Sequence, residues 1–324
     1  MRGEARLIER LRRRFAAGGG LRVGIGDDAA VFSGEGRRDW VVTADFLVEN
    51  VHFLPQQPAR AVGWKALARS LSDTAAMGAR PRYALVSLAL PARTPEAWVE
   101  EFYAGLGQLA RRHGVRVAGG DLSAARQIVA DVQMVGEVAK GEAVLRRGAR
   151  PGHLLCVSGQ LGLSRLGLAC LRHRVASVRP LLKRAVRAHF FPQPRVRLGR
   201  FLAARGVSAM IDLSDGLSTD LAHLCKASRV GARLYAGKIP ALKLPPAVAR
   251  RFRTTALELA LDGGEDYELL FALPKARARR LPKKLGGIPL TVVGEITRER
   301  RMVLVDSNGR ERKLEARGWE HFPR

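Results

Sequence analysis

Carboxylates recur along this chain inside short segments that are rich in glycine and other small residues. Four such segments stand in the first part of the chain and two in the second: GIGDDAA, TADFLVENVHF, SLSDTAAMGA and GGDLS, then IDLSDGLSTD and GGEDYEL. A single aspartate beside glycine is ordinary turn chemistry. Here nearly every acidic residue stands where an apolar strand pattern gives way to a turn, a position at which rigid scaffolds present functional groups. Carboxylates cannot gather away from water unless positive charge joins them, and Mg²⁺ suits oxygen ligands, so the repetition predicts a divalent-cation site.

Helix and strand patterns occur on both sides of a loop, RGARPGH, that follows Arg146. Apolar spacing predicts helices near residues 7–15, 61–77, 196–204 and 218–227, and one that begins at Thr94–Pro95 and ends at Gly114. Strand patterns fall at 40–45, 115–118, 128–138, 154–157, 209–211, 267–272 and 290–296. This mixture without strict alternation predicts a pair of α/β or α+β domains, which we place at residues 1–147 and 148–324.

Length and composition favour an intracellular globular protein. The 324 residues are 47% hydrophobic, which suits two ordinary cores, and no apolar run is long enough to predict a membrane span. Glu4 and Glu9 interrupt the Arg-rich N-terminal segment and so argue against a transit peptide, and we expect a cytoplasmic location. Three widely spaced cysteines without a CxxC pair predict neither a disulfide framework nor a zinc site.

The net charge of +26 raises nucleic acid as a partner. However, the basic residues are spread along the whole chain, and aromatic residues, at 6%, do not interleave with them to form a stacking platform. We therefore expect a solvated basic surface without specific nucleic-acid binding.

Taken in order, the motifs resemble the thiamine-monophosphate kinase family, within the superfamily that also holds aminoimidazole ribonucleotide synthetase and selenophosphate synthetase. The resemblance covers nearly the whole chain through GIGDD, LVENVHF, KALARSLSDTAAMGA, GGD, RRGARPG, IDLSDGL, GGEDYEL and GWEHF. It implies a two-domain aminoimidazole ribonucleotide synthetase-like fold, in which the N-terminal sheet pairs with that of a second subunit and the active site lies between the domains. It also implies ATP as co-substrate, several Mg²⁺ ions and thiamine monophosphate as acceptor, and leaves a monovalent cation open.

The same resemblance implies roles for individual residues. Matching the metal-holding positions are Asp28, Thr43, Ala44, Asp45, Asp73, Asp121, Asp212 and Asp215. Matching the ATP-contacting positions are Gly120, Asp121, Arg146 and Ser214, and matching the positions that face thiamine monophosphate are His52, Glu265 and Trp319. Phosphoryl transfer depends mainly on positioning and charge stabilisation, and no residue is assigned as a covalent nucleophile, so we expect direct in-line transfer.

Four positions depart from the family pattern: Phe46 stands where a small hydroxyl residue is usual, Asn50 where glycine is usual, and His153 and Leu163 where aspartate is frequent. Two other functions stay open. One is an aminoimidazole ribonucleotide synthetase-like enzyme of the same superfamily, and the other is a basic nucleic-acid-binding protein whose aspartates are only turn residues.

Overall fold

A computed structural model of the chain describes residues 3–15, 17–175 and 179–321. The chain forms two compact units. Unit 2 comprises Leu11–Ala143 together with Phe190–Arg200, and unit 1 comprises Met1–Arg10, Val144–His189 and Phe201–Arg324. Each is described by itself below.

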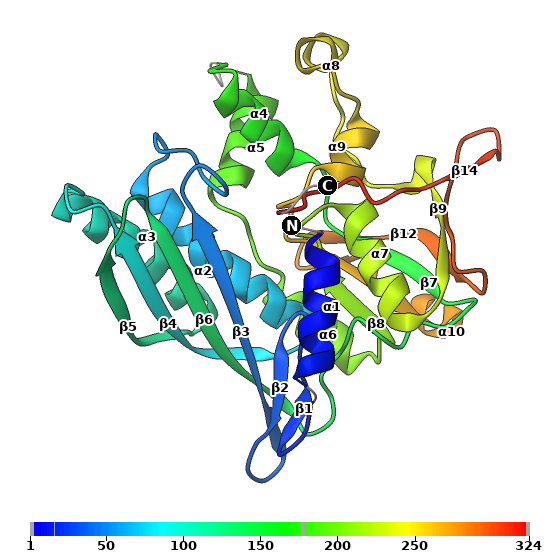
Figure 1. Cartoon of the computed structure of the whole chain (residues 1–324). Helices are drawn as coiled ribbons and strands as arrows, with labels where there is room; N and C mark the ends of the chain where they lie inside the picture. Colours follow the sequence, from blue (N-terminus) through cyan, green and yellow to red (C-terminus); the bar gives the residue numbers. More distant parts are fainter. Residues whose placement is uncertain (1–2, 16, 176–178, 322–324) are drawn as a thin grey trace. The chain divides into compact units, whose positions relative to one another are not determined.

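Unit 2 is built on a six-stranded sheet with the order β1-β2-β3-β6-β4-β5 (Figure 1). Its strands are β1 (Leu21–Val23), β2 (Ala30–Ser33), β3 (Arg38–Val48), β4 (Arg80–Leu90), β5 (Arg116–Ala124) and β6 (Val129–Ala139). All neighbours are antiparallel except β4 and β5, which are parallel and are joined by a helical crossover. The edge strand β5 carries the GGD motif.

Two helices, α2 (Ala59–Ala76) and α3 (Glu96–His113), cover one face of this sheet (Figure 1). The predicted end of α3 is confirmed, because Gly114 adopts the left-handed conformation that commonly closes a helix. The segment Phe190–Arg200 packs against the same helices, where the Trp64 indole N–H donates to the Pro192 carbonyl oxygen at 2.7 Å.

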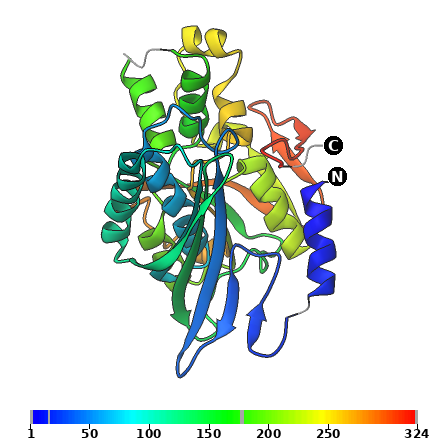
Figure 2. The same ribbon diagram turned by 60° about the vertical axis from the view of Figure 1, so that its left-hand side comes forward.

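The opposite face of the sheet is not covered by α2 or α3 (Figure 2). Large apolar side chains on this face are exposed. Strand register places five of them on this open face: Phe32, Trp40, Phe46, Tyr83 and Leu85. Phe46 is 58% exposed and Tyr83 is 45% exposed. Several large exposed apolar side chains on one face of a sheet are typical of an interaction face.

Unit 1 contains an eight-stranded mixed sheet with the path β14-β13-β9-β12-β7-β10-β8, and β11 pairs with β12. Its strands are β7 (Leu154–Ser158), β8 (Ala209–Asp212), β9 (Gly231–Tyr235), β10 (Leu269–Leu273), β11 (Lys284–Leu285), β12 (Ile288–Thr297), β13 (Met302–Val305) and β14 (Glu311–Lys313). The sheet is buried against α7 (Leu217–Ser228), whose Leu217, Leu221 and Leu224 belong to the main core.

A second, smaller core joins α4 (Leu163–Arg172), α5 (Pro180–Phe190), α8 (Pro246–Phe252) and α9 (Ala256–Asp262). The remaining helices are α1 (Glu4–Arg14), α6 (Val196–Ala204), α10 (Lys275–Ala278) and the short 3₁₀ helix Ala236–Lys238. None of the helices within the described ranges has the length and apolar character that crossing a membrane requires. The mixed α/β architecture predicted from the sequence is confirmed, and the placing of the domain boundary after residue 147 stays a prediction.

Candidate active site

In unit 1 the acidic motif IDLSDG forms the loop that follows β8. Asp212 is the last residue of this strand and is only 2% exposed, whereas Ser214 and Asp215 are half-buried. The loop leads directly into α7, which begins after Gly216. The sequence thus places two carboxylates at the end of a buried strand, as predicted.

The GGEDYEL motif lies beside this loop and is paired with it through the backbone. The N–H of Glu265 donates to the Ser214 carbonyl oxygen at 2.7 Å, and the N–H of Tyr267 donates to that of Leu213 at 2.9 Å. These bonds continue the antiparallel pairing of β8 with β10. Glu265 has a φ of +57°, a left-handed conformation that is uncommon outside glycine and that the paired loops hold in place.

The C-terminal segment docks on the first turn of α7. The Trp319 N–H donates to the Asp215 carbonyl oxygen at 3.1 Å, and the Gly318 N–H donates to Thr219 Oγ1 at 2.9 Å. A Cβ atom at Gly318 would lie 2.0 Å from the Asp215 carbonyl oxygen, so glycine is required for this close approach. The indole of Trp319 remains 42% exposed beside the acidic loop.

A third aspartate, Asp220 of α7, accepts hydrogen bonds from the backbone of this loop. Its Oδ2 accepts from the N–H groups of Asp215 and Gly216 at 3.2 and 3.1 Å, and so joins the loop to the first turn of α7. Burial and the nearby charges of Asp215 and Asp212 raise the pKa of Asp220 well above its usual range, whereas Arg146 opposes this shift. Arg146 is therefore the basic residue that acts on the acidic loop, while its neighbour Arg147 is exposed.

Glu265 is held from the side by the helices α4 and α5. Its Oε2 lies 3.3 Å from Nδ1 of His189, a residue only 1% exposed, and Ser164 Oγ lies 3.1 Å from the same nitrogen. These contacts fix the direction of the carboxylate that sequence resemblance assigns to the substrate.

The glycine-rich turn before α4 offers helix N-terminal N–H groups, which commonly bind anions. Here a side chain of the protein itself occupies one of these N–H groups, because Asp266 Oδ2 accepts from the Gly162 N–H at 2.8 Å. Burial raises the pKa of the Asp266 carboxyl to about 7, although this hydrogen bond opposes the shift.

In unit 2 three of the predicted metal-holding residues lie together. A carboxylate oxygen of Asp28 and one of Asp73 are within 4.8 Å of each other. Thr43 Oγ1 lies 2.7 Å from Asp73 Oδ2 and 3.2 Å from the Asp28 carbonyl oxygen. Asp73 comes from the last turn of α2, Thr43 from β3 and Asp28 from the segment before β2, so the tertiary fold gathers the cluster.

Asp45 lies two residues further along β3 and is engaged by a cation. Arg69 of α2 donates to Asp45 Oδ1 at 2.7 Å, and both side chains are largely buried. Ala44 between Thr43 and Asp45 offers only backbone groups and is exposed on the other face of the strand.

Gly120 and Asp121 lie within β5, which is the edge strand of the sheet, and Asp121 is exposed. The register pairs Ser87 with both Asp121 and Asp131, so Asp121 shares the open face of the sheet, whereas Asp45 points to α2. The expectation that these motifs begin a turn is wrong for Asp45 and Asp121. Both strands continue past them, because the backbones of β3 and β5 stay paired with β6 and β4 beyond these residues.

His52 lies in the turn after β3. Its Nδ1 accepts from the Val48 N–H at 3.0 Å, and its carbonyl oxygen accepts from the buried Lys65 ammonium at 3.0 Å. The proton of the neutral ring is therefore on Nε2, which can donate to an acceptor.

The same turn explains one departure from the family pattern. Asn50 has a φ of +63°, the left-handed conformation for which glycine is best suited and asparagine is the most tolerated alternative. Phe46, another departure, belongs to the exposed apolar set of the open sheet face.

The structure thus brings Asp28, Thr43 and Asp73 together in unit 2, and joins the segments of Asp212, Ser214, Asp215, Glu265 and Trp319 in unit 1. Four residues that contact the predicted site residues, directly or through one another, were not predicted from the sequence: Arg69, Ser164, His189 and Asp220. Asp220 carried a local signal, since acidic residues are favoured in the first turn of a helix. His189 carried none, because its partners are distant in the sequence.

Comparison with known proteins adds to this geometry. Residues 26–138 match the family model for the N-terminal domain of AIR synthase related proteins, and residues 150–307 match that for the C-terminal domain. The thiamine-monophosphate kinase of Escherichia coli K12 is 37% identical over 310 residues, which cover 93% of this chain and 92% of that protein. The Bacillus subtilis thiamine-monophosphate kinase is 33% identical, with 93% of each chain covered.

Solved structures are similar to this chain as well. AaThiL complexed with AMPPCP and TMP superposes with a TM-score of 0.88 at 33% identity, covering 99% of this chain and 97% of that one. Hydrogenase maturation protein HypE in complex with ATP has a TM-score of 0.71 at 20% identity, which shows a shared fold alone.

Proposed function

The chain belongs to the thiamine-monophosphate kinase family, and from this premise we infer that it transfers the γ-phosphoryl group of ATP to thiamine monophosphate, giving thiamine diphosphate and ADP. One structural observation supports the inference most strongly. The IDLSDG loop, the GGEDYEL loop and the segment with Trp319 are joined by backbone hydrogen bonds, so residues proposed for metal, nucleotide and substrate lie side by side in unit 1.

We propose that Ser214 and Arg146 contact the ATP phosphates, together with Gly120 and Asp121 of unit 2. A guanidinium offers a planar fork of donors that matches phosphate oxygens, and Arg146 already acts on the charge of the acidic loop. Glu265, held by His189, and the exposed indole of Trp319 would face the acceptor. We also propose His52 as an acceptor-side residue, although its Nε2 is buried in this structure. No side chain is needed as a covalent carrier, so transfer is a single in-line step.

The acidic residues fit Mg²⁺. Asp28 and Asp73 offer neighbouring carboxylates and Thr43 a hydroxyl, an all-oxygen set that suits a hard cation. We propose Asp45 and Asp121 of unit 2, and Asp212 and Asp215 of unit 1, as further Mg²⁺ ligands, with Ala44 contributing its carbonyl oxygen. Asp45 and Asp121 lie on opposite faces of the sheet, so we assign them to different ions. When bound, Mg²⁺ would neutralise charge on the phosphates during transfer.

The function is tested by measuring ADP release with thiamine monophosphate, thiamine and an aminoimidazole ribonucleotide precursor as separate acceptors. We expect release with thiamine monophosphate and thiamine diphosphate as product. Release only with the aminoimidazole precursor would assign the chain to the rival activity. Intersecting initial-rate lines are expected, whereas parallel lines would indicate a phosphoenzyme and contradict direct transfer.

Trp319 should contribute to acceptor binding. An aromatic face attracts a cation such as a thiazolium ring by about 0.5 to 2 kcal/mol. We expect Trp319→Ala to raise the KM for thiamine monophosphate by roughly 2- to 30-fold while changing the KM for ATP by less than about twofold. Trp319→Phe, which keeps a ring, should lie close to wild type. Equal rises in both KM values would instead indicate that the side chain only supports the fold.

We also propose that the open sheet face of unit 2 forms a homodimer interface. Tyr83 and Leu85 are 45% and 41% exposed on this face, and Phe46 is 58% exposed. Placing a charge among them would oppose burial of the whole patch. Leu85→Glu should therefore give a monomer in light scattering after gel filtration. Val292→Glu, which changes an exposed apolar residue of unit 1, is the control and should remain dimeric.

The basic surface should not bind nucleic acid specifically, and a cytoplasmic location remains part of this proposal. Weak retention of DNA or RNA that disappears with added salt is the expected result, because dispersed charge gives a salt-sensitive and sequence-independent attraction. Tight binding at physiological salt would favour the nucleic-acid alternative.

A further inference from the structure

A groove with a volume of about 600 Å³ lies in unit 1 between the C-terminal end of α7 and the strands β13 and β14. Its apolar lining comes from Ala222, Val230, Met302, Val303 and Leu314. Its polar lining is almost entirely basic: Lys226, Arg229, Arg300, Arg301, Arg312 and Lys313. Glu311 is the one acidic residue that lines it.

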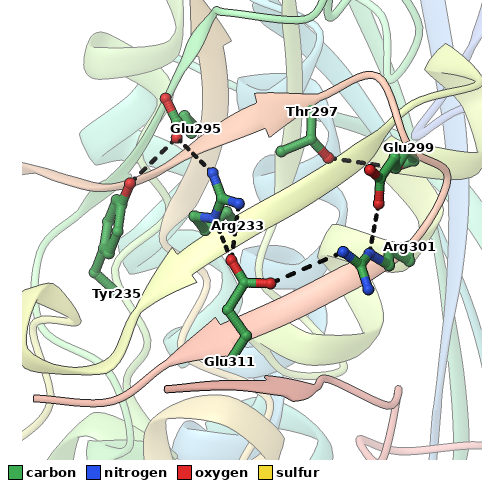
Figure 3. A network of polar contacts seen from close by, with 7 residues as sticks. All are labelled: Arg233, Tyr235, Glu295, Thr297, Glu299, Arg301 and Glu311. Atoms are coloured by element: carbon green, nitrogen blue, oxygen red, sulfur yellow. Dashed lines mark hydrogen bonds and ion pairs between the residues drawn. The ribbon is translucent and has the colours of Figure 1, made fainter. Parts of the chain in front are cut away.

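That carboxylate is already engaged. Glu311 Oε1 lies 2.8 Å from Arg233, which also contacts Glu295, and Glu311 Oε2 lies 4.0 Å from Arg301 (Figure 3). Arg301 in turn binds Glu299 at 2.7 Å. Lys313 is paired with Glu315 at 3.2 Å.

The other four cations of the groove are not neutralised in this way. Among the described residues, no acidic group lies within salt-bridge distance of Lys226, Arg229, Arg300 or Arg312, and all four are exposed. Lys226 and Arg229 have a structural reason for their place, because the carbonyl end of a helix favours cations. Arg300 and Arg312 come from a turn and from an edge strand, where this reason is absent.

The turn that carries Arg300 is held rigidly against β9. The Ala232 N–H donates to the Arg301 carbonyl oxygen at 3.1 Å, and the Arg301 N–H donates to that of Glu299 at 2.8 Å. A Cβ atom at Gly231 would lie 1.9 Å from the Glu299 carbonyl oxygen, so only glycine permits this approach. The backbone of the turn that carries Arg300 is therefore held in place by the fold.

We propose that this groove binds an organic polyphosphate, with its phosphates on the four cations and its ring system on the apolar lining. Arginine forks suit phosphate oxygens, and the volume lies in the range typical of small-molecule sites. Because its one carboxylate is engaged by two arginines, the groove needs no divalent cation to bind the ligand. It is separate from the acidic loop, since the 12 residues of α7 span roughly 18 Å between the two.

The probe is ATP, titrated calorimetrically in the presence of EDTA, so that metal-dependent binding at the acidic residues is suppressed. We expect wild type to bind ATP, and the double variant Arg229→Glu/Arg312→Glu to bind at least tenfold more weakly. Lys275→Glu/Arg279→Glu makes the same change in net charge on and beside α10 and should bind within twofold of wild type. Absence of binding to wild type, or an equal loss in both double variants, would overturn the proposal.

Two further measurements are needed. The first tests whether ATP binds in this groove or at the acidic loop, and the second tests whether the ligand is organic or a bare polyphosphate. Arg146→Ala, which removes the cation proposed to contact the phosphates at the acidic loop, should still bind ATP in EDTA as wild type does. A loss there would place the ligand at the acidic loop and refute a second site. Inorganic tripolyphosphate should bind at least fivefold more weakly than ATP, because it cannot use the apolar lining. Equal affinities would reject an organic ligand. None of these readouts depends on kinase activity, so the proposal can fail while the proposed function stands.

Discussion

Replacing Asp212 by asparagine is expected to reduce phosphoryl transfer by roughly a hundredfold or more, because the change removes charge from the group proposed to hold the metal and thereby the phosphates. The same change should leave the metal-free protein as stable as wild type or more stable. Burial, and after it the neighbouring charges of Asp215 and Asp212, raise the pKa of Asp220, as expected where carboxylates lie close together. Charges about 5 Å apart repel by roughly 3 kcal/mol at an effective dielectric constant near 20, and asparagine removes part of this cost.

The measurements are steady-state ADP release and thermal unfolding with and without Mg²⁺ and ATP. Ligand binding raises the melting temperature by mass action, so the rise should be far larger for wild type than for Asp212→Asn. Ile211→Val, one residue earlier in β8, is the control for a small packing change and should keep most of the activity. If Asp212→Asn kept its activity but lost metal-free stability, Asp212 would be structural and the metal-kinase mechanism would be rejected.

Stability should depend on pH through Asp266. Burial raises the pKa of this carboxyl to about 7 in the folded protein, from an ordinary value of 3.8. Between these two values the folded state keeps a proton that the unfolded chain has released, so the free energy of unfolding falls as the pH rises through this window. Asp266→Asn removes this dependence while an amide oxygen can still accept from Gly162. The variant should gain about 2 to 3 kcal/mol relative to wild type between about pH 5 and pH 8.

Urea unfolding at about pH 5 and pH 8 measures this difference in the free energy of unfolding. Tryptophan fluorescence and circular dichroism are both recorded, because a chain with two units can unfold in more than one step. Glu142→Gln, at an exposed position, serves as the control and should show the same pH dependence as wild type. A variant curve that runs parallel to wild type would mean that Asp266 is ionised in the folded protein over the whole range.

The elements with a clean local signal were predicted well. The helix α3 ends at Gly114 as predicted, and the long strand β6 matches its apolar run. The start of α3 is one residue later than predicted, because Pro95 and not Thr94 is the N-cap residue and no side chain caps the helix. The strand β4 was not predicted. It carries Tyr83 and Leu85 on the open face and buried Ala84, Val86 and Leu88 on the other, so apolar residues on both faces hide the alternation that identifies a strand.

The short helices of the smaller core show a different limit. The helix α8 has seven residues and begins at consecutive prolines, and its Val248 contributes to a core built from four separate helices. Segments this short are helical because of their packing, and the partners in that packing are far away in the sequence.

The residues of the candidate site were likewise predicted only in part. Its acidic residues were identified because several motifs repeat one chemistry, and the fold gathers Asp28, Thr43 and Asp73 as a result of tertiary structure. The ion pair of Asp45 with Arg69 and the contact of Glu265 with His189 could not be predicted, since each joins side chains from different elements. The sequence therefore identified the acidic groups but not the residues that orient them.

The segment Phe190–Arg200 completes unit 2 although it follows a long stretch of unit 1 in the chain. During synthesis on a ribosome, which extends the chain from its N-terminus, the sheet of unit 2 is made early. The hydrogen bond from the Trp64 indole to the Pro192 carbonyl oxygen can form only after residue 192 has been synthesised. Unit 2 can complete its fold only after residue 200 has left the exit tunnel. Nascent chains stalled before and after that point should therefore differ sharply in protease resistance, which makes late completion of unit 2 a property of how this protein is synthesised.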